Sequence, residues 1–258
     1  MDEQTFRYES YGASDKGKIR PLNEDSFLLQ PKSGLWMVAD GMGGHDAGEV
    51  ASGGIVEQIK TMGVASSAAD QHARFVDRLA RANQKLRAYS AERDGATVGS
   101  TVAALLIFGG QYRCIWMGDS RVYQLRKGVL TQVSKDHSEV QELVDKGVLS
   151  REEARSWPRR NVITRAVGVD DDINVDVVFG QIEPGDTYLL CSDGLTAHLT
   201  DEDIRQTVAG RKAKEACEAL VKLTLERGAT DNVTAIVVQC RSADSTVPVE
   251  SALLTPAG

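Results

Sequence analysis

Four aspartates of this sequence stand at the ends of short apolar runs. Three follow such a run within two residues and the fourth precedes one: Asp40, Asp119, Asp193 and Asp231. Apolar runs of this length are typical of buried strands, and strands that share one core end at common edges. A single Asp-Gly pair usually marks only a β-turn. Four aspartates attached to core strands instead predict that their carboxylates converge on one end of a sheet.

Convergent carboxylates need a positive charge or a proton between them. At a separation of about 4 Å, two carboxylates repel by roughly 4 kcal/mol at an effective dielectric near 20. Protonation could relieve this repulsion, and so could a hard divalent cation. A ligand set made only of oxygen suits Mg²⁺ or Mn²⁺ and disfavours zinc, which prefers nitrogen and sulfur. Gly41 and Gly194 follow two of the aspartates, where we expect tight backbone turns that could bring a carbonyl oxygen to the metal.

A second polar cluster lies upstream and contains Arg20, Glu24 and Asp25. The guanidinium of an arginine presents a planar fork of donors that suits a phosphate better than a lysine does. Glu24 and Asp25 could orient water molecules bound to a metal. Taken alone, such a hexapeptide is more typical of a solvated charged loop.

Strand-like and helix-like segments alternate irregularly along the chain. Helices are predicted over residues 48–62, 71–91, 201–209 and 211–227, and a helix-prone polar insertion over 138–158. Strands are predicted over residues 35–39, 101–108, 112–117, 121–125, 173–179, 187–191 and 232–239, the second to fourth of these as an antiparallel meander. Clustered strands without regular β-α alternation argue against a doubly wound sheet. They favour an α+β fold in which helices cover a β-sandwich.

Composition narrows the class of protein. With 258 residues the chain is long enough for one substantial domain. Its net charge of −7 argues against a nucleic-acid-binding protein, and its longest apolar run, 102–108, is too short to span a membrane. The N-terminus is acidic and polar, unlike a secretory signal. The four cysteines are scattered, which favours reduced core residues. We therefore expect a cytoplasmic protein.

The ordered set of motifs resembles the metal-dependent protein Ser/Thr phosphatases, the PPM or type 2C family, in its bacterial branch. The matching stretches begin at Ser14, Asn23, Val38, Gly99, Gly118, Ile163, Ser192 and Asp231. Each motif alone is weakly specific, whereas their occurrence in the family's order over about residues 8–240 is highly specific. The resemblance implies two stacked antiparallel sheets with helices on both outer faces, which agrees with the reading of the strands above.

The resemblance also implies a role for each acidic residue and a cofactor of two or three Mn²⁺ or Mg²⁺ ions. Asp40 would bridge two of the metals. Asp193 and Asp231 would complete one site, and the carbonyl oxygen of Gly41 would complete the other. Asp119 would join Asp193 at a third, weaker site.

Arg20, Glu24 and Asp25 would serve the substrate rather than bind a metal directly. By the same resemblance, Arg20 would bind the substrate phosphate, while Glu24 and Asp25 would hold metal-bound waters. Met42 replaces the histidine that animal members carry after the Asp-Gly pair, which leaves the general acid unassigned. His45 is a candidate for that role, but the preferred interpretation is that it is an ordinary solvent-facing loop residue. The preferred general acid is a metal-bound water.

The expected reaction is hydrolysis of phosphoserine and phosphothreonine in proteins by a metal-activated water. Motifs for a cysteine phosphatase loop, a serine nucleophile elbow or a P-loop are absent from the sequence. We expect a single domain over 1–240, a mobile flap over 134–165 and a loose tail over 241–258. The expected protein is a monomer that acts on phosphoproteins and opposes a Ser/Thr kinase. It binds neither nucleic acid nor membrane.

Two alternative functions remain open from the sequence. The first is another two-metal hydrolase that acts on small phosphate esters such as nucleotides or sugar phosphates. The second is a catalytically inactive adaptor that keeps the phosphatase fold for binding. Comparing turnover of phosphopeptides with turnover of small phosphate esters distinguishes the first alternative from a protein phosphatase. The second is disfavoured because every acidic residue of the family's motifs is present.

Overall fold

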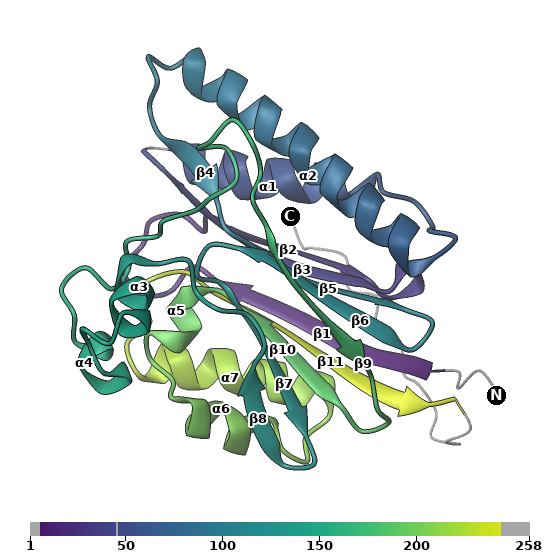
Figure 1. Cartoon of the computed structure of the whole chain (residues 1–258). Helices are drawn as coiled ribbons and strands as arrows, with labels where there is room; N and C mark the ends of the chain where they lie inside the picture. Colours follow the sequence, from purple (N-terminus) through teal and green to yellow (C-terminus); the bar gives the residue numbers. More distant parts are fainter. Residues whose placement is uncertain (1–5, 45, 244–258) are drawn as a thin grey trace.

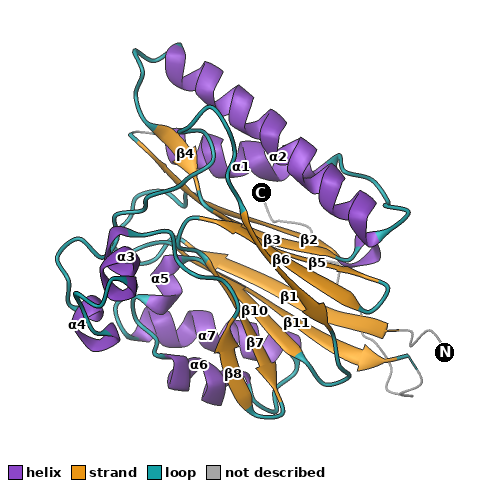
Figure 2. Cartoon of the chain, viewed as in Figure 1, coloured by secondary structure: helices purple, strands orange, loops and turns teal. Residues whose placement is uncertain are grey.

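Two antiparallel sheets packed face to face form the centre of the molecule, with helices on both outer sides (Figures 1 and 2). The computed structural model describes residues 6–44 and 46–243. Side chains alternate between the two faces of each strand, so each sheet contributes one face to the middle of the sandwich and one to a helical layer. The architecture predicted from the sequence is confirmed.

Five strands of the described residues form the first sheet. Its order is β1 (Phe6–Asp15), β11 (Val233–Ser242), β10 (Thr187–Cys191), β7 (Arg121–Arg126) and β8 (Val129–Gln132). All its strand pairs are antiparallel. The central strand β10 is buried along its whole length, and it is the strand that ends just before Asp193.

Within the part of the chain that the structure describes, six strands form the second sheet. Its main order is β2 (Asp25–Gln30), β3 (Leu35–Gly43), β5 (Val102–Phe108), β6 (Gln111–Met117) and β9 (Asp176–Gln181), while β4 (Val98–Ser100) pairs with the end of β3. A short 3₁₀ turn, Pro31–Ser33, connects the first two of these strands. Asp40 lies near the end of β3, and Asp119 follows β6 after one glycine.

Two long helices cover the second sheet and three helices cover the first (Figure 1). The first pair is α1 (Ala47–Lys60) and α2 (Ala68–Ala91); the other three are α5 (Asp193–Thr196), α6 (Asp201–Val208) and α7 (Ala213–Glu226). The Ser67 hydroxyl accepts a hydrogen bond from the Asp70 amide and so caps the start of α2. Phe75, Leu79 and Leu86 lie on one face of that helix and are buried against the sheet.

Three apolar cores hold the layers together. One lies between α1, α2 and the second sheet, and another between α5, α6, α7 and the first sheet. The third fills the space between the sheets and includes Trp36, Trp116 and Tyr188. Burial on both faces of the central strands fixes where those strands end, and therefore where the aspartates lie.

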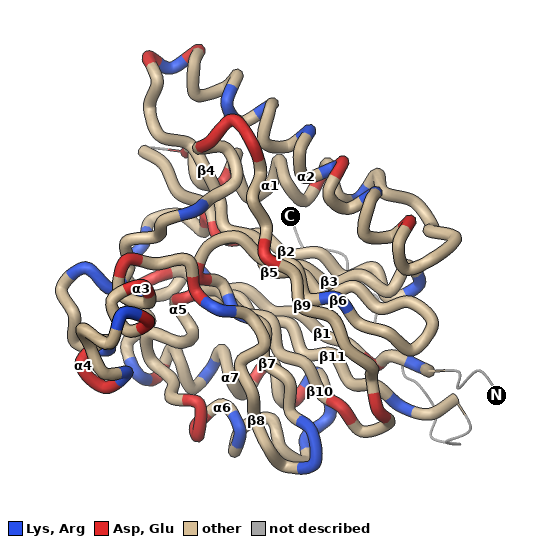
Figure 3. The backbone as a smooth tube through the Cα atoms, in the orientation of Figure 1, with Lys and Arg blue, Asp and Glu red and all other residues tan. Residues whose placement is uncertain are grey.

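A polar excursion leaves the sandwich between β8 and β9. Residues 134–165, called the flap segment below, contain α3 (Glu139–Asp145) and α4 (Arg151–Arg155). Every residue from 139 to 165 is partly or fully exposed. Acidic and basic residues are interleaved along the segment (Figure 3). It is therefore not part of any of the three cores.

The predicted meander is wrong in its third strand. Residues 101–108 and 112–117 pair with each other as β5 and β6, but the chain then crosses to the other sheet. There β7 pairs with β8 and β10. The Gly-Asp-Ser stretch at 118–120 is thus a crossover between sheets rather than a hairpin turn, which moves Asp119 to the gap where the two sheets meet.

The structure also contains strands that the sequence reading did not predict, namely β1, β2, β4 and β8. The predicted strand 173–179 is observed as β9, displaced by two to three residues, and the last strand extends to Ser242. Residues 244–258 of the predicted tail lie outside the described part of the chain. All four cysteines are buried and free, as predicted. No described helix combines the length and apolarity needed to cross a membrane.

Candidate metal centre

Asp25 and Asp40 face each other on neighbouring strands at the edge of the second sheet. In the antiparallel pair β2–β3, Asp25 lies directly opposite Asp40. Side chains in such a pair are separated by about 5 Å at Cβ. The Asp25 side chain is 7% exposed, and its Oδ2 accepts a hydrogen bond of 2.7 Å from the Ser192 hydroxyl of the other sheet. Two carboxylates from neighbouring strands of one sheet therefore lie side by side, and the Ser192 hydrogen bond ties one of them to the other sheet.

Asp193 and Asp231 come from the first sheet. Asp193 is the first residue of α5 and lies two residues after the end of β10, and Asp231 lies two residues before β11. Strands β10 and β11 pair with each other. A Cβ atom added to Gly194 would lie 1.9 Å from the Asn232 carbonyl oxygen, so only glycine allows the two segments to approach this closely.

Burial and mutual repulsion act together on the buried acids. Burial raises the pKa of Asp40 well above its usual range, and the charges of Asp25, Asp193, Asp119 and Asp231 raise it further. The four strand-end aspartates therefore lie close enough to influence one another, as the sequence predicted, and Asp25, which the sequence placed in a separate cluster, joins them.

Asp25 and Asp193 are perturbed in the same direction. Burial raises the pKa of Asp25 to about 7, the nearby charges of Asp193 and Asp231 add to the shift, and hydrogen bonds from Thr234 and Ser192 offset part of it. Burial likewise raises the pKa of Asp193 to about 6, with Asp231 as the second cause. A cation bound among these groups would reverse such shifts, because it stabilises the charged forms.

Asp119 joins the cluster from the crossover between β6 and β7. Its side chain is 9% exposed. Burial raises its pKa well above the usual range, Asp193 and Asp136 raise it further, and Arg121 lowers it. Asp119 is thus closely associated with Asp193, the residue with which the resemblance paired it.

Arg20 and Glu24 complete the rim of the cluster. The Arg20 Nη2 atom donates a hydrogen bond of 2.7 Å to Asp231 Oδ2, and this bond raises the pKa of the arginine. About half of the Arg20 side chain is exposed, at 47%. Burial raises the pKa of Glu24, and the charge of Arg20 lowers it. A cationic group therefore lies at the open side of the acidic cluster, where an anion could reach it.

Backbone contacts hold the strand ends in place. A Cβ atom at Gly41 would lie 2.0 Å from the Gly48 carbonyl oxygen and 2.7 Å from that of Glu24. Neither Gly41 nor Gly194 has a positive φ angle, so the predicted tight turns are wrong. Gly41 lies within β3 and Gly194 within α5. The reason for glycine at both positions is close approach of another backbone rather than a left-handed conformation.

Asn232 connects the acidic cluster with the loop that carries Arg20. Its Oδ1 accepts a hydrogen bond from the Glu24 amide, and its Nδ2 donates to the carbonyl oxygens of Lys16 and Leu22. The sequence reading placed Asn232 in a motif but assigned it no role. Its position next to Asp231 was the available signal, since a buried asparagine needs several partners.

The oxygen atoms present fit a divalent cation. Glu24 Oε1 and Asp25 Oδ1 are buried and lack a hydrogen-bond partner in the described structure, although such atoms normally have one. Among the described residues, no three acidic, histidine or cysteine side chains already form a closed coordination group. A hard cation here would therefore take further oxygen ligands from the backbone or from water, as Mg²⁺ commonly does.

Met42 and His45 are the two residues near the Asp-Gly pair that bear on the identity of the general acid. Met42 lies within β3 and contacts the backbone of Gly99, because a Cβ atom at Gly99 would lie 2.8 Å from its Cε. Its thioether has no proton to donate. His45 lies outside the described residues, so its candidacy stays a prediction.

The sandwich and its acidic cluster define an α+β protein with a candidate divalent-cation centre where the two sheets meet. A family model for protein phosphatase 2C matches residues 19–236. Over 225 residues the chain is 37% identical to the serine/threonine protein phosphatase PstP of Mycobacterium tuberculosis. That alignment covers 87% of this chain but 43% of PstP, so the chain spans less than half the length of that relative.

Solved structures of similar proteins have the same fold. PppA, described as a key regulatory component of the T6SS in Pseudomonas aeruginosa, matches with a TM-score of 0.85 at 41% identity, over 90% of this chain and 97% of that chain. The catalytic domain of PstP in complex with two manganese ions matches with a TM-score of 0.85 at 33% identity, over 92% of this chain and 100% of that chain. The chain belongs to the protein phosphatase 2C family, as its motifs predicted.

Proposed function

We propose that this chain is a divalent-cation-dependent phosphatase that removes phosphate from phosphoserine and phosphothreonine in proteins. The observation that carries the proposal is the cluster of buried carboxylates from separate parts of the chain, with the exposed Arg20 guanidinium beside it. Membership of the protein phosphatase 2C family supports it, as do relatives that carry the name serine/threonine protein phosphatase.

The proposed metal ligands are those that the resemblance implied. Asp40 would bridge two cations, Asp193 and Asp231 would complete one site, and the Gly41 carbonyl the other. Asp119 would hold a third cation together with Asp193. A relative crystallised with two manganese ions supports Mn²⁺ or Mg²⁺ as the cofactor. When bound, such ions lower the pKa of a coordinated water and offset negative charge on a phosphoryl group.

The remaining polar groups of the site would bind the substrate phosphate and orient water. Arg20 presents its guanidinium at the open side of the cluster, and its planar donors would hold two phosphate oxygens. Asp25 and Glu24 each have a buried oxygen free to accept a hydrogen bond from water. Phosphoryl transfer depends chiefly on positioning and on stabilisation of charge, so these residues would orient the attacking water and the phosphate in line. The general acid would be a water molecule, since Met42 cannot donate a proton.

The substrates and partners belong to the same proposal. Phosphoproteins are the proposed substrates, and a Ser/Thr kinase that makes those phosphosites is the proposed opposing enzyme. PppA is described as a regulatory component of the T6SS, which supports a regulatory role for a similar chain. We also propose a single catalytic domain over 1–240, with the flap segment beside its site, acting as a cytoplasmic monomer.

The test is phosphate release from a phosphothreonine peptide by protein stripped of metal and then titrated with Mn²⁺ or Mg²⁺. We expect turnover only with the cation, and loss of turnover in excess EDTA. Activity that persists undiminished in EDTA would remove the metal-dependent scheme. Arg20→Ala is expected to raise KM for the peptide, and an unchanged KM would remove Arg20 from phosphate binding.

The same assay separates the alternatives. A nucleotide or a sugar phosphate turned over faster than the phosphopeptide would favour a hydrolase of small esters. Tight phosphopeptide binding without turnover at saturating Mn²⁺ would favour an inactive adaptor.

A further inference from the structure

Four consecutive residues at the start of the flap segment contact the crossover that carries Asp119 or the strand residues that flank it. These residues, 134–137, are called the flap root below. The Ser134 hydroxyl accepts from the Val122 amide at 2.9 Å, and the Lys135 carbonyl accepts from Trp116 Nε1 at 2.7 Å. The next two residues contact the crossover on either side of Asp119. The beginning of the flap segment is therefore fixed to both ends of this crossover.

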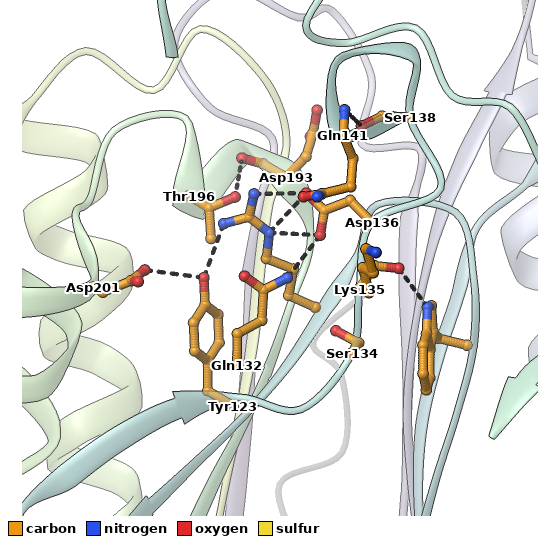
Figure 4. A network of polar contacts seen from close by, with 12 residues as sticks. Tyr123, Gln132, Ser134, Lys135, Asp136, Ser138, Gln141, Asp193, Thr196 and Asp201 are labelled. Atoms are coloured by element: carbon orange, nitrogen blue, oxygen red, sulfur yellow. Dashed lines mark hydrogen bonds and ion pairs between the residues drawn. The ribbon is translucent and has the colours of Figure 1, made fainter. Parts of the chain in front are cut away.

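Asp136 holds Arg121, two residues after Asp119. The guanidinium donates to both carboxylate oxygens of Asp136, with Nε–Oδ1 at 2.9 Å and Nη2–Oδ2 at 2.6 Å. The two side chains are only 27% and 10% exposed. Bidentate, partly buried pairs are among the stronger charged interactions in proteins. Figure 4 shows Asp136 in a polar network that also includes Tyr123 and Gln132, while Asp193 in the same view is joined to Thr196.

His137 holds Gly118, the residue before Asp119. The Gly118 amide donates to His137 Nδ1 at 3.2 Å, and the His137 amide donates to the Gly118 carbonyl at 2.8 Å. Because Nδ1 accepts, the ring proton lies on Nε2, which is 3.2 Å from Asp176 Oδ2. The imidazole also stacks on Trp116. Gly118 has a φ angle of +110°, a conformation that no other residue type would readily hold.

The returning end of the flap segment meets the same histidine. The Thr164 amide donates to the His137 carbonyl at 2.8 Å, and Arg165 pairs with Asp176 at 3.0 Å. Between these ends, residues 139–165 are all partly or fully exposed. Both ends of the flap segment are therefore anchored at one histidine, and the part between them is free of the apolar cores.

The crossover is connected in turn to Asp40. The Ser120 and Thr101 hydroxyls are 2.7 Å apart, and the Asp40 amide donates to the Thr101 hydroxyl at 3.0 Å. Asp119 thus lies on a short, rigid link between the flap root and the proposed bridging ligand. A change at the flap root would move Asp119 relative to Asp193, and the oxygens of a cation site must be placed within a few tenths of an ångström.

We infer that Asp136 and His137 are positioning residues that couple the flap segment to cation affinity at Asp119. The inference rests on the proposed function, since it needs the cation site shared by Asp119 and Asp193. Coupling between binding sites is reciprocal. A substrate or partner that contacts the flap segment would therefore tighten or weaken cation binding at Asp119, and the cation would change affinity for that ligand equally.

The test is direct measurement of Mn²⁺ binding by electron paramagnetic resonance of the free ion, on the intact chain. Asp119→Asn is expected to remove the weakest of three bound ions, which identifies the site. Asp136→Asn is expected to weaken that same ion on the order of tenfold or more, as outer partners of metal ligands commonly do. The two tighter ions should change by less than about twofold.

Glu139→Gln is the matched control. Glu139 is a flap carboxylate three residues away that pairs with Arg159, at 2.8 Å, within the flap segment itself. Its loss should leave all three affinities unchanged. An equal loss of affinity in Glu139→Gln and Asp136→Asn would overturn the inference, because the effect would then belong to the flap segment in general.

Two substitutions of His137 provide an independent test, one that removes the hydrogen-bond acceptor and one that restores it. His137→Leu removes the acceptor for the Gly118 amide, and we expect weaker binding of the third ion and faster hydrogen exchange at that amide. His137→Asn places an oxygen near the position of Nδ1 and should restore most of both. If Asp136→Asn does not fold, this pair alone decides the question.

Several outcomes separate the inference from the function on which it rests. A wild-type chain that binds only two Mn²⁺ ions, or variants with unchanged affinity for the third, would overturn the inference and leave the phosphatase proposal intact. A wild-type chain that binds no Mn²⁺ would remove both.

Discussion

The strand ends that carry the acids and the flap segment beside them are held by different forces. The acids are attached to strands such as β3 and β10, whose residues are buried against apolar layers on both faces. The flap segment buries no residue between 139 and 165, all of which the structure describes, and it is held by polar contacts at its root. The comparison teaches that this fold fixes the positions of its proposed metal-binding side chains by apolar packing, whereas the neighbouring segment is not constrained by the apolar cores.

The two kinds of contact differ in strength. Truncation of a buried leucine commonly destabilises a protein by about 2–5 kcal/mol, whereas an exposed ion pair contributes about 0–1 kcal/mol. Substitutions in the sandwich should therefore affect the free energy of unfolding, while substitutions of the exposed flap residues between 139 and 165 should leave it nearly unchanged. The predictions below test this division, from the largest expected effect to the smallest.

Asp193→Asn tests the acids themselves. We expect kcat to fall by about 100-fold or more, because a metal supplies several kcal/mol of charge stabilisation. The metal-free variant should be at least as stable as the wild type, since a buried and repelled charge is removed. Steady-state kinetics and thermal unfolding check the two parts. Normal kcat in a folded variant would show that the ligand assignment is wrong.

Leu79→Ala tests the core beside the second sheet. Leu79 is fully buried, so we expect a loss of about 2–5 kcal/mol in the free energy of unfolding by urea titration. The control is Val148→Ala in the flap segment, where the side chain is exposed and the expected change is within about 0.5 kcal/mol. Equal losses in the two variants would contradict the division between sandwich and flap segment.

The pH dependence of stability tests whether the acids are strained without a cation. Asp25 and Asp193 have pKa values raised to about 7 and about 6, mainly by burial. Between pH 4 and 7 the folded state therefore binds more protons than the unfolded state, so stability falls as pH rises through this window. We expect the metal-free protein to gain about 2–3 kcal/mol between pH 8 and 5.5, because each pKa unit by which a folded-state pKa exceeds the lower pH contributes about 1.4 kcal/mol.

Saturating Mg²⁺ should remove this dependence of stability on pH. The bound cation, in place of bound protons, then offsets the charge of the carboxylates. Chemical denaturation at several pH values, with and without the cation, provides the measurement. A metal-free protein whose stability is flat across the window would show that the acids do not strain one another.

Arg159→Ala tests the smallest effect. Arg159 pairs with Glu139, and their side chains are 63% and 35% exposed. We expect a change in the free energy of unfolding below about 1 kcal/mol, and one that shrinks with added salt. A larger loss would show that the flap segment contributes to the cooperative core.

The sequence was sufficient to predict the convergence of the acids, because each aspartate follows or precedes an apolar run long enough to be a buried strand. It placed residues 121–125 in the wrong sheet, since alternation of side chains identifies a strand but not its partner. It also missed β1, in which every residue is at least partly exposed. An edge strand of this kind has no continuous apolar run to reveal it.

The contacts that support the site were beyond the reach of the sequence for a different reason. Asn232 meets Glu24 across 208 positions of the chain, and Asp136 meets Arg121 only because the chain crosses between sheets at Asp119. Such pairs depend on the register and topology of both sheets. The glycines after Asp40 and Asp193 were predicted to form tight turns, but the reason for glycine is the close approach of Gly48 and Asn232, which only the packed structure reveals.

Anomalous X-ray diffraction from crystals grown with saturating Mn²⁺ tests the central claim most directly, because it locates manganese without reference to activity. We predict two strong peaks among Asp40, Asp193 and Asp231, one of them beside the Gly41 carbonyl, and a weaker third beside Asp119. Crystals that show no manganese among these carboxylates, or manganese bound only elsewhere on the surface, would contradict the claim.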